Sequence, residues 1–195
     1  MEATKEKSPA QRETPREVIE KMRMDLGNGR YDEVLGAMPR FRESVTAQLM
    51  ESRTEAEDSE SEYEVSHTER VLKPRALMLQ KVAADAKENG SHPESAVLQY
   101  DRLYVEFTTI LSAARDLDYL SEDMAKTLDS AVKGKSLERE EGRHSLIGEP
   151  LLALKEQVES AISVAKANCK EAAEAFATKI GTEPGVIFGR KRGLD

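Results

Sequence analysis

The sequence predicts an all-α protein: an irregular bundle of five to seven helices with two long central helices and extended N- and C-terminal arms. Three observations support this class. The 195-residue chain is 34% charged and 38% apolar, with no Trp, so Leu, Val, Ile, Met and Ala must supply the core. Residues of these types, together with Glu, Lys and Arg, favour helix. Prolines and capping residues mark helix starts, and no segment alternates polar and apolar residues long enough to indicate a strand.

The first helix is predicted over residues 14–27. Pro15 suits the first helical position, and Glu17 completes a capping box with Thr14. Gly27 and Gly29 end the helix. The apolar residues between these signals share one face: Val18, Ile19, Met22 and Leu26.

A second helical region is expected over residues 30–52, with a kink or break at Pro39, because proline lacks a backbone N–H. Another helix follows from Pro74 to Asn89. The segment Gly29–Met38 resembles the helix start of tetratricopeptide repeats, in which Gly-x-Tyr-x-x-Ala-Leu is frequent, with Val34 in place of Ala. It occurs once, and such arrays need several repeats to bury a core, so we expect no repeat fold.

The two long helices are predicted at about residues 93–117 and 150–180. The first carries an apolar stripe at spacings of three and four: Val97, Tyr100, Tyr104, Phe107, Leu111 and Ala114. Ser121 is then predicted to cap a shorter helix that ends at Gly134. The second long helix has an Ala-rich stripe, flanked by Ile162, Cys169 and Phe176, which lets another helix approach closely. The members of that stripe are Leu151, Leu154, Val158, Ala161, Ala165, Asn168, Ala172 and Ala175.

The acidity of the chain is concentrated in one segment. Residues 51–69 hold eight acids and one Arg, which gives −7 of the total net charge of −8 and leaves about −1 for the rest. We expect this segment to be exposed. The predicted organisation is a flexible N-terminal arm over 1–13, a helical domain over 14–180 and a C-terminal docking tail over 181–195.

The tail combines an apolar triplet with three cations: Val186, Ile187 and Phe188, then Arg190, Lys191 and Arg192. Exposed Ile and Phe are unfavourable unless they are covered, so we predict a docking peptide whose cations meet acids on a protein partner. The expected partner is another copy of this chain or another subunit, and the Glu51–Glu69 segment is a candidate acidic surface. The alternative is a nucleic-acid contact, which three cations would make weak and salt-sensitive.

A second alternative is a metal site of the ferritin-like di-iron or manganese carboxylate kind. Such bundles use two Glu-x-x-His pairs and two further carboxylates. The sequence offers the pairs Glu64 with His67 and Glu141 with His144, and the carboxylates of Glu33 and Glu106. Both pairs lie in polar surroundings and Glu is abundant, so we expect solvated Glu-His neighbours and no metal or cofactor.

No catalytic or nucleotide-binding motif is present in the sequence. Cys169 is the single cysteine, so an intramolecular disulfide is impossible and a reducing compartment fits best. We find no membrane span and no signal peptide, and expect the cytoplasm or an intracellularly assembled particle. The resulting hypothesis is a non-enzymatic helical structural or interaction protein within an oligomer or larger assembly, for example a virion, secretion-system or scaffold component.

Overall fold

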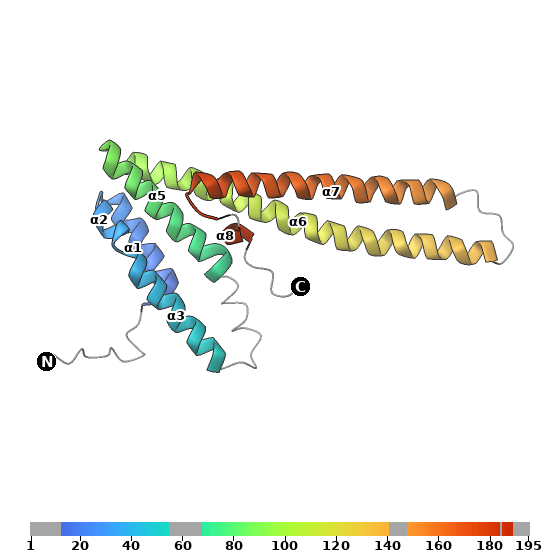
Figure 1. Ribbon diagram of the computed structural model, residues 1–195, viewed down its shortest axis with the longest axis horizontal. Helices are drawn as coiled ribbons and strands as arrows, with labels where there is room; N and C mark the ends of the chain where they lie inside the picture. Colours follow the sequence, from blue (N-terminus) through green and yellow to red (C-terminus); the bar gives the residue numbers. More distant parts are fainter. Residues whose placement is uncertain (1–12, 55–67, 141–147, 184, 189–195) are drawn as a thin grey trace. The chain divides into compact units, whose positions relative to one another are not determined.

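The computed structural model describes residues 13–54, 68–140, 148–183 and 185–188, and these residues form an all-α fold (Figure 1). The elements are α1 (Pro15–Gly27), α2 (Tyr31–Leu35), α3 (Met38–Thr54), a π-helical turn η2 (Thr68–Leu72), α5 (Lys73–Asn89), α6 (Pro93–Glu140), α7 (Gly148–Lys179) and α8 (Gly185–Phe188). The predicted fold class is confirmed, and α6 and α7 are the two long helices, with 48 and 32 residues. The predicted N-terminal arm falls almost wholly outside the described residues, and the predicted tail over 181–195 is described at residues 181–183 and 185–188.

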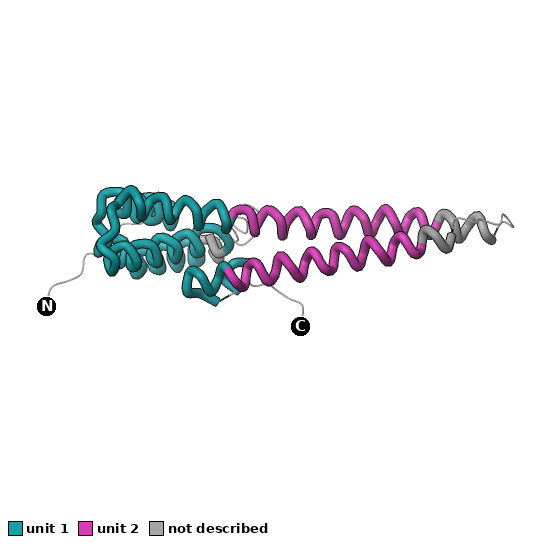
Figure 2. Tube along the Cα trace, turned by 90° about the horizontal axis from the view of Figure 1, so that it is seen from above, with its two compact units in different colours: residues 1–107, 176–195 teal, residues 108–175 magenta. Residues whose placement is uncertain are grey.

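The chain groups into two compact units, coloured separately in Figure 2. Unit 1 contains residues 1–107 and 176–195, and unit 2 contains residues 108–175. The boundary between the units runs through α6 and α7, inside the range 14–180 that the sequence predicts as one helical domain. Each long helix therefore contributes one end to unit 1 and a longer stretch to unit 2.

Helix α1 begins and buries its apolar face as the sequence predicts. The backbone N–H of Glu17 donates to Thr14 Oγ1 at 3.3 Å, and the backbone N–H of Thr14 donates to Glu17 Oε2 at 2.8 Å. These bonds satisfy two N–H groups that the first helical turn leaves without partners. The four predicted core residues of this helix are at most 2% exposed: Val18, Ile19, Met22 and Leu26.

The turns between the first helices follow from glycine and proline. Gly29 has a φ of +71°, and a Cβ there would lie 3.0 Å from the ring of Pro93. A larger residue at this position would therefore be strained in its backbone and crowded at its side chain. The predicted break before residue 40 is confirmed, because α2 ends at Leu35 and Pro39 lies in the first turn of α3.

The core of unit 1 is formed by side chains from every helix that enters it. Helix α5 packs against α1, α2 and α3, and α8 packs against η2 and α5. The rings of Phe107 on α6 and Phe176 on α7 stack with centroids 5.9 Å apart. The largest fully buried side chains include Tyr100, Phe107, Phe176, Ile19, Met22, Leu26, Met78, Leu79 and Ile187.

A cluster around Arg75 joins three helices at the edge of this core. Arg75 Nε donates to the hydroxyl oxygen of Tyr100 at 3.2 Å, and its guanidinium also contacts Glu20 Oε1 at 3.2 Å. The guanidinium carbon lies 5.1 Å from the centroid of the Tyr104 ring. Burial raises the pKa of the Tyr100 hydroxyl, so it stays protonated and can both donate and accept hydrogen bonds. This arrangement fixes α5 against α1 and α6.

The prediction of a separate helix starting at Ser121 is wrong, because α6 continues without a break from Pro93 to Glu140. Ser121 lies half-buried in its interior and Gly134 does not end it. A serine marks a helix start only where the preceding chain leaves the helical conformation, and no proline occurs here to force that. A single internal glycine costs a helix only about 1 kcal/mol relative to Ala, which the rest of the helix outweighs.

Candidate interaction surfaces

In unit 2, α6 and α7 form an antiparallel pair of helices. Lys166 Nζ lies 3.1 Å from Asp118 Oδ1, and Lys155 pairs with Asp129 further along α6. Cys169 Sγ lies 3.8 Å from the backbone oxygen of Ile110. Partners that come later in α6 come earlier in α7, which defines the antiparallel direction.

The contact between these two helices is a seam of side chains that are mostly only half-buried. On α6 the half-buried seam residues are Leu111, Ala114, Leu117, Ser121 and Met124. On α7 they are Val158, Ile162, Ala165 and Cys169. Spacings of three and four residues keep this seam on one side of each helix. Two helices alone cover each other's stripes from one direction, and so the seam stays partly open.

The predicted apolar stripe of the second long helix overlaps this seam only in part. Five of its members are exposed, Leu154, Ala161, Asn168, Ala172 and Ala175, and two, Val158 and Ala165, lie in the seam. The residues predicted only to flank the stripe, Ile162 and Cys169, also lie in the seam. The predicted stripe and the α7 seam residues are both uncharged and lie side by side on the helix, so together they form one wide uncharged arc. Which half of that arc faces α6 is decided by the packing of α6.

One flank of the pair carries the ion pairs. The residues on this flank come directly after seam residues in the sequence. Asp118 follows Leu117 on α6, and Lys166 follows Ala165 on α7. The Asp129 carboxylate accepts a hydrogen bond from Lys155, which lowers the pKa of Asp129 and raises the pKa of Lys155. Asp118 and Asp129 are exposed, and Lys155 and Lys166 are only half-buried, so each pair contributes little to stability.

The opposite flank is uncharged along its inner edge. Its residues precede seam residues at seven-residue intervals, which places them on one side of each helix. All seven are exposed, and we call them the uncharged flank: Ala113, Leu120 and Thr127 of α6, and Leu154, Ala161, Asn168 and Ala175 of α7. Leu120 is 45% exposed and Leu154 is 49% exposed. The sequence interpretation missed Leu120, because reading Ser121 as a cap ended the stripe of α6 too early.

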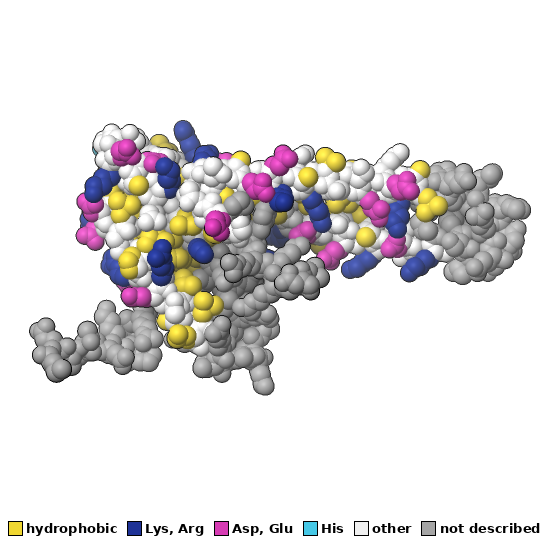
Figure 3. Space-filling model, viewed as in Figure 1, with side chains coloured by type: hydrophobic (Ala, Val, Ile, Leu, Met, Phe, Trp, Pro, Cys, Tyr) yellow, Lys and Arg dark blue, Asp and Glu magenta, His cyan; other side chains and the backbone are white. Residues whose placement is uncertain are grey.

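Further out from the seam, the two helices differ in charge. Asp116 and Asp123 border the flank on α6. On α7 the border consists of Gln157, Val164 and Glu171, and Val164 is 58% exposed. Along unit 2, hydrophobic side chains reach the surface between charged ones (Figure 3).

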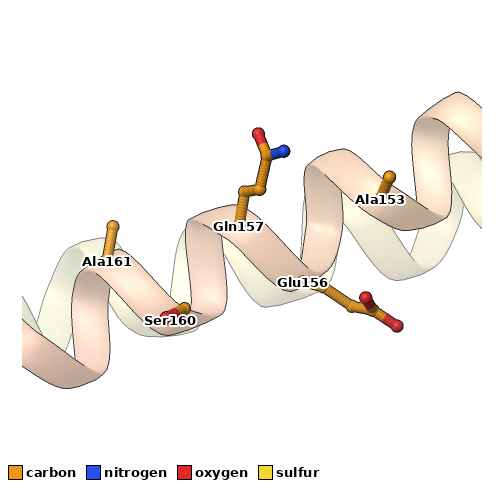
Figure 4. A pocket seen from close by; sticks show the side chains of 5 residues that line it. All are labelled: Ala153, Glu156, Gln157, Ser160 and Ala161. Atoms are coloured by element: carbon orange, nitrogen blue, oxygen red, sulfur yellow. The ribbon is translucent and has the colours of Figure 1, made fainter.

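A depression of about 460 Å³ lies on α7 beside this flank. Its lining residues all come from this one helix: Ala153, Glu156, Gln157, Ser160 and Ala161. Figure 4 shows Ala153, Gln157 and Ala161 pointing to one side of the helix and Glu156 pointing to another. A hollow lined by a single helix holds no convergent set of catalytic groups, and we treat it as part of the surface around the uncharged flank.

The C-terminal tail places its central apolar residue inside its own chain. Ile187 in α8 is fully buried, and α8 packs against η2 and α5 in unit 1. Val186 is half-buried, and the side chain of Phe188 lies outside the described residues. In this structure Ile187 therefore anchors the tail on the chain itself rather than lying exposed for a neighbour.

The basic end of the tail and most of the acidic segment cannot be placed in the same way. Arg190, Lys191 and Arg192 lie outside the described residues, as do residues 55–67. Their contact with a partner, or with nucleic acid, stays a prediction. Because η2 begins at Thr68, at the end of the acidic segment 51–69, the packing of α8 against η2 places α8 near the end of that segment in its own chain.

The di-iron alternative also lies mostly outside the described residues, which exclude Glu64, His67, Glu141 and His144. Glu33 is exposed on α2. Glu106 pairs with Lys179, whose Nζ lies 2.5 Å from Glu106 Oε2. Within the described ranges, no group of three or more His, Cys, Asp and Glu side chains lies close enough to hold a metal ion.

Cys169 behaves as a seam residue. Partial burial, followed by the nearby negative charge of Asp118, raises the pKa of its thiol. The neutral thiol is a weak nucleophile, so this position favours packing over reactivity.

Among the residues that the structure describes, no helix is both long enough and apolar enough to cross a membrane. The chain matches no protein-family model, no curated protein and no solved structure.

Proposed function

We propose that this chain is a non-enzymatic helical interaction protein that works within an oligomer or a larger protein assembly. The observation that carries the proposal is the uncharged flank of unit 2, where exposed Leu, Ala, Thr and Asn side chains recur at seven-residue intervals on two adjacent helices. A periodic uncharged row on paired helices is what a further helix packs against.

The two units support different parts of this role. Unit 1 has a closed core and holds the α8 tail against itself, which makes it a rigid base. Unit 2 leaves its seam half-open and its flank exposed, so the surface available for a protein partner lies there. The basic residues Arg190, Lys191 and Arg192 remain a second predicted contact with acidic partner surfaces.

The native mass of the full chain tests the proposal. The tagged protein would be expressed at its natural level, and the extract fractionated by size in low-salt buffer with the tag detected in each fraction. We expect the chain to elute in particles at least twice the mass of the monomer. Elution as a monomer from undiluted extract would contradict the proposed function.

A further inference from the structure

The uncharged flank differs in shape between its two helices. On α6, the long side chain of Leu120 stands on the flank, and Leu117 and Met124 lie half-buried beside it in the seam. On α7, the flank residues nearest to the level of Leu120 are Ala161 and Asn168, one on either side of that level, and both have shorter side chains. The ion pair between Lys166 and Asp118 fixes this level, because it sets the register of the two helices. The flank therefore consists of a ridge on α6 and a trough on α7.

A second copy of the same surface is complementary to this ridge and trough. A two-fold axis running along the helices places the ridge of each copy against the trough of the other, and both contacts form at once because such an interface is isologous. Ridges packed into grooves are the usual way in which helices associate.

Charge favours the same arrangement, because only one of the two α6 carboxylates, Asp116, then lies near another acid. The other two-fold axis, perpendicular to the helices, would bring α6 against α6 and gather Asp116 and Asp123 of both copies together. Like charges brought together at an interface are unfavourable. With α6 against α7 of the other copy, Asp123 instead borders Gln157 and Val164, which carry no charge. Asp116, which already pairs with Arg115 at 3.4 Å, then lies level with the stretch between Val164 and Glu171.

The size of the surface suits a stable dimer. The paired part of α6 and α7 runs for about 35 Å, and each helix is about 10 Å wide with its side chains. A face that is two helices wide and this long presents about 700 Å² per copy, close to the roughly 800 Å² per partner of standard protein interfaces.

The rest of the printed sequence offers nothing suited to covering the flank from within. The segments outside the described residues hold no more than two consecutive apolar residues and carry frequent charges: residues 1–12, 55–67, 141–147 and 189–195. Burying such charges against an uncharged surface would be unfavourable. A helix surface of another chain suits the flank better than any of these segments.

We propose that the uncharged flank is a self-association surface, through which two copies of this chain pair with α6 of each against α7 of the other. This inference rests on the proposed function and names its partner. Two hairpins packed in this way form a four-helix bundle, in which the half-open seams of both copies become covered.

Sedimentation of the purified full chain at micromolar concentrations tests the surface. The variants Ala161→Glu and Ala167→Glu make the same change at two exposed positions of α7, and only the first lies on the flank. We expect a wild-type dimer, about tenfold or more weaker dimerisation for Ala161→Glu because it buries an unpaired charge, and a change within about twofold for Ala167→Glu. Circular dichroism checks that both variants keep their helix content.

Mixing two variants tests which helices meet. Ala161→Glu and Leu120→Lys each weaken self-pairing, but a dimer with one copy of each brings the new carboxylate and the new ammonium group together across the interface, while the second contact stays wild-type. We expect the mixture to dimerise more strongly than either variant alone. In a Cys169→Ser background, a short thiol crosslinker should join Leu120→Cys chains to Ala161→Cys chains and leave Leu120→Cys chains alone uncrosslinked.

The outcomes separate this inference from the proposed function. A wild-type chain that is monomeric when pure, yet elutes at high mass from extract, would overturn self-association and leave the assembly role standing. A dimer that Ala161→Glu and Ala167→Glu leave equally intact would place the interface elsewhere. Efficient crosslinking of Leu120→Cys chains to each other would reject the pairing of α6 with α7.

Discussion

Units 1 and 2 share the same two long helices but bury them to different degrees. In unit 1, Phe107 of α6 and Phe176 of α7 stack on each other and are at most 1% exposed, and this unit also contains α1, α2, α3, α5 and α8. In unit 2, Leu117 and Ile162 occupy equivalent seam positions and are only half-buried. The difference shows that a helix face becomes a core only when elements cover it from more than one side. Two helices alone leave a surface suited to further helices.

The largest expected effect contrasts the same substitution in the two units. Leu79 in unit 1 is fully buried, and Leu154 in unit 2 is 49% exposed. Leu79→Ala should lower the free energy of unfolding by about 3 kcal/mol, because it removes buried methyl groups and leaves a cavity. Leu154→Ala should lower it by less than about 1 kcal/mol, because much of that side chain is already in water. Urea unfolding at low protein concentration measures both values. Equal losses would mean that the flank is as closely packed as the core.

A smaller effect is expected where the tail enters unit 1. Ile187→Ala should weaken the docking of α8 by about 2 kcal/mol, because this side chain is fully buried. The loss for Ile187→Ala cannot exceed the free energy with which the whole α8 segment docks. A chain that ends at Thr182 lacks this segment, so its loss of stability gives the upper limit. Val186→Ala is the control, since Val186 is half-buried in the same short helix. Urea unfolding that finds no loss for Ile187→Ala would show that α8 does not stabilise unit 1.

The smallest effects are expected at the exposed start of α1. Thr14→Ala should cost about 1 kcal/mol, because it removes the capping box. The Thr14 backbone N–H, and then its hydroxyl group, lower the pKa of Glu17 below its ordinary value of 4.5. The Glu17 carboxylate therefore stabilises the folded chain above that pH, and its contribution is lost as the pH falls through the folded-state pKa. Glu17→Gln should flatten this part of the acid dependence in thermal unfolding, and an unchanged acid profile would contradict the capping role.

Local signals in the sequence were reliable where they act within a few residues. The capping box at Thr14, the break before Pro39 and the helix end at Asn89 are all confirmed. Each depends on backbone geometry or hydrogen bonds between near neighbours, which the sequence states directly. Ser121 failed as a start signal because the same residue is acceptable inside a helix when nothing interrupts the chain before it.

The sequence by itself determined the fold class, the places of most helices and the uncharged arc of the long C-terminal helix, because each follows from composition and periodicity. Only the tertiary structure decided which part of that arc faces α6, since register depends on residues far apart in the sequence, such as Asp118 and Lys166. It also decided that Ile187 is covered by its own chain while Leu120 and Ala161 are not. The sequence shows which residues are apolar, but only the tertiary structure shows which of them the chain's own helices bury.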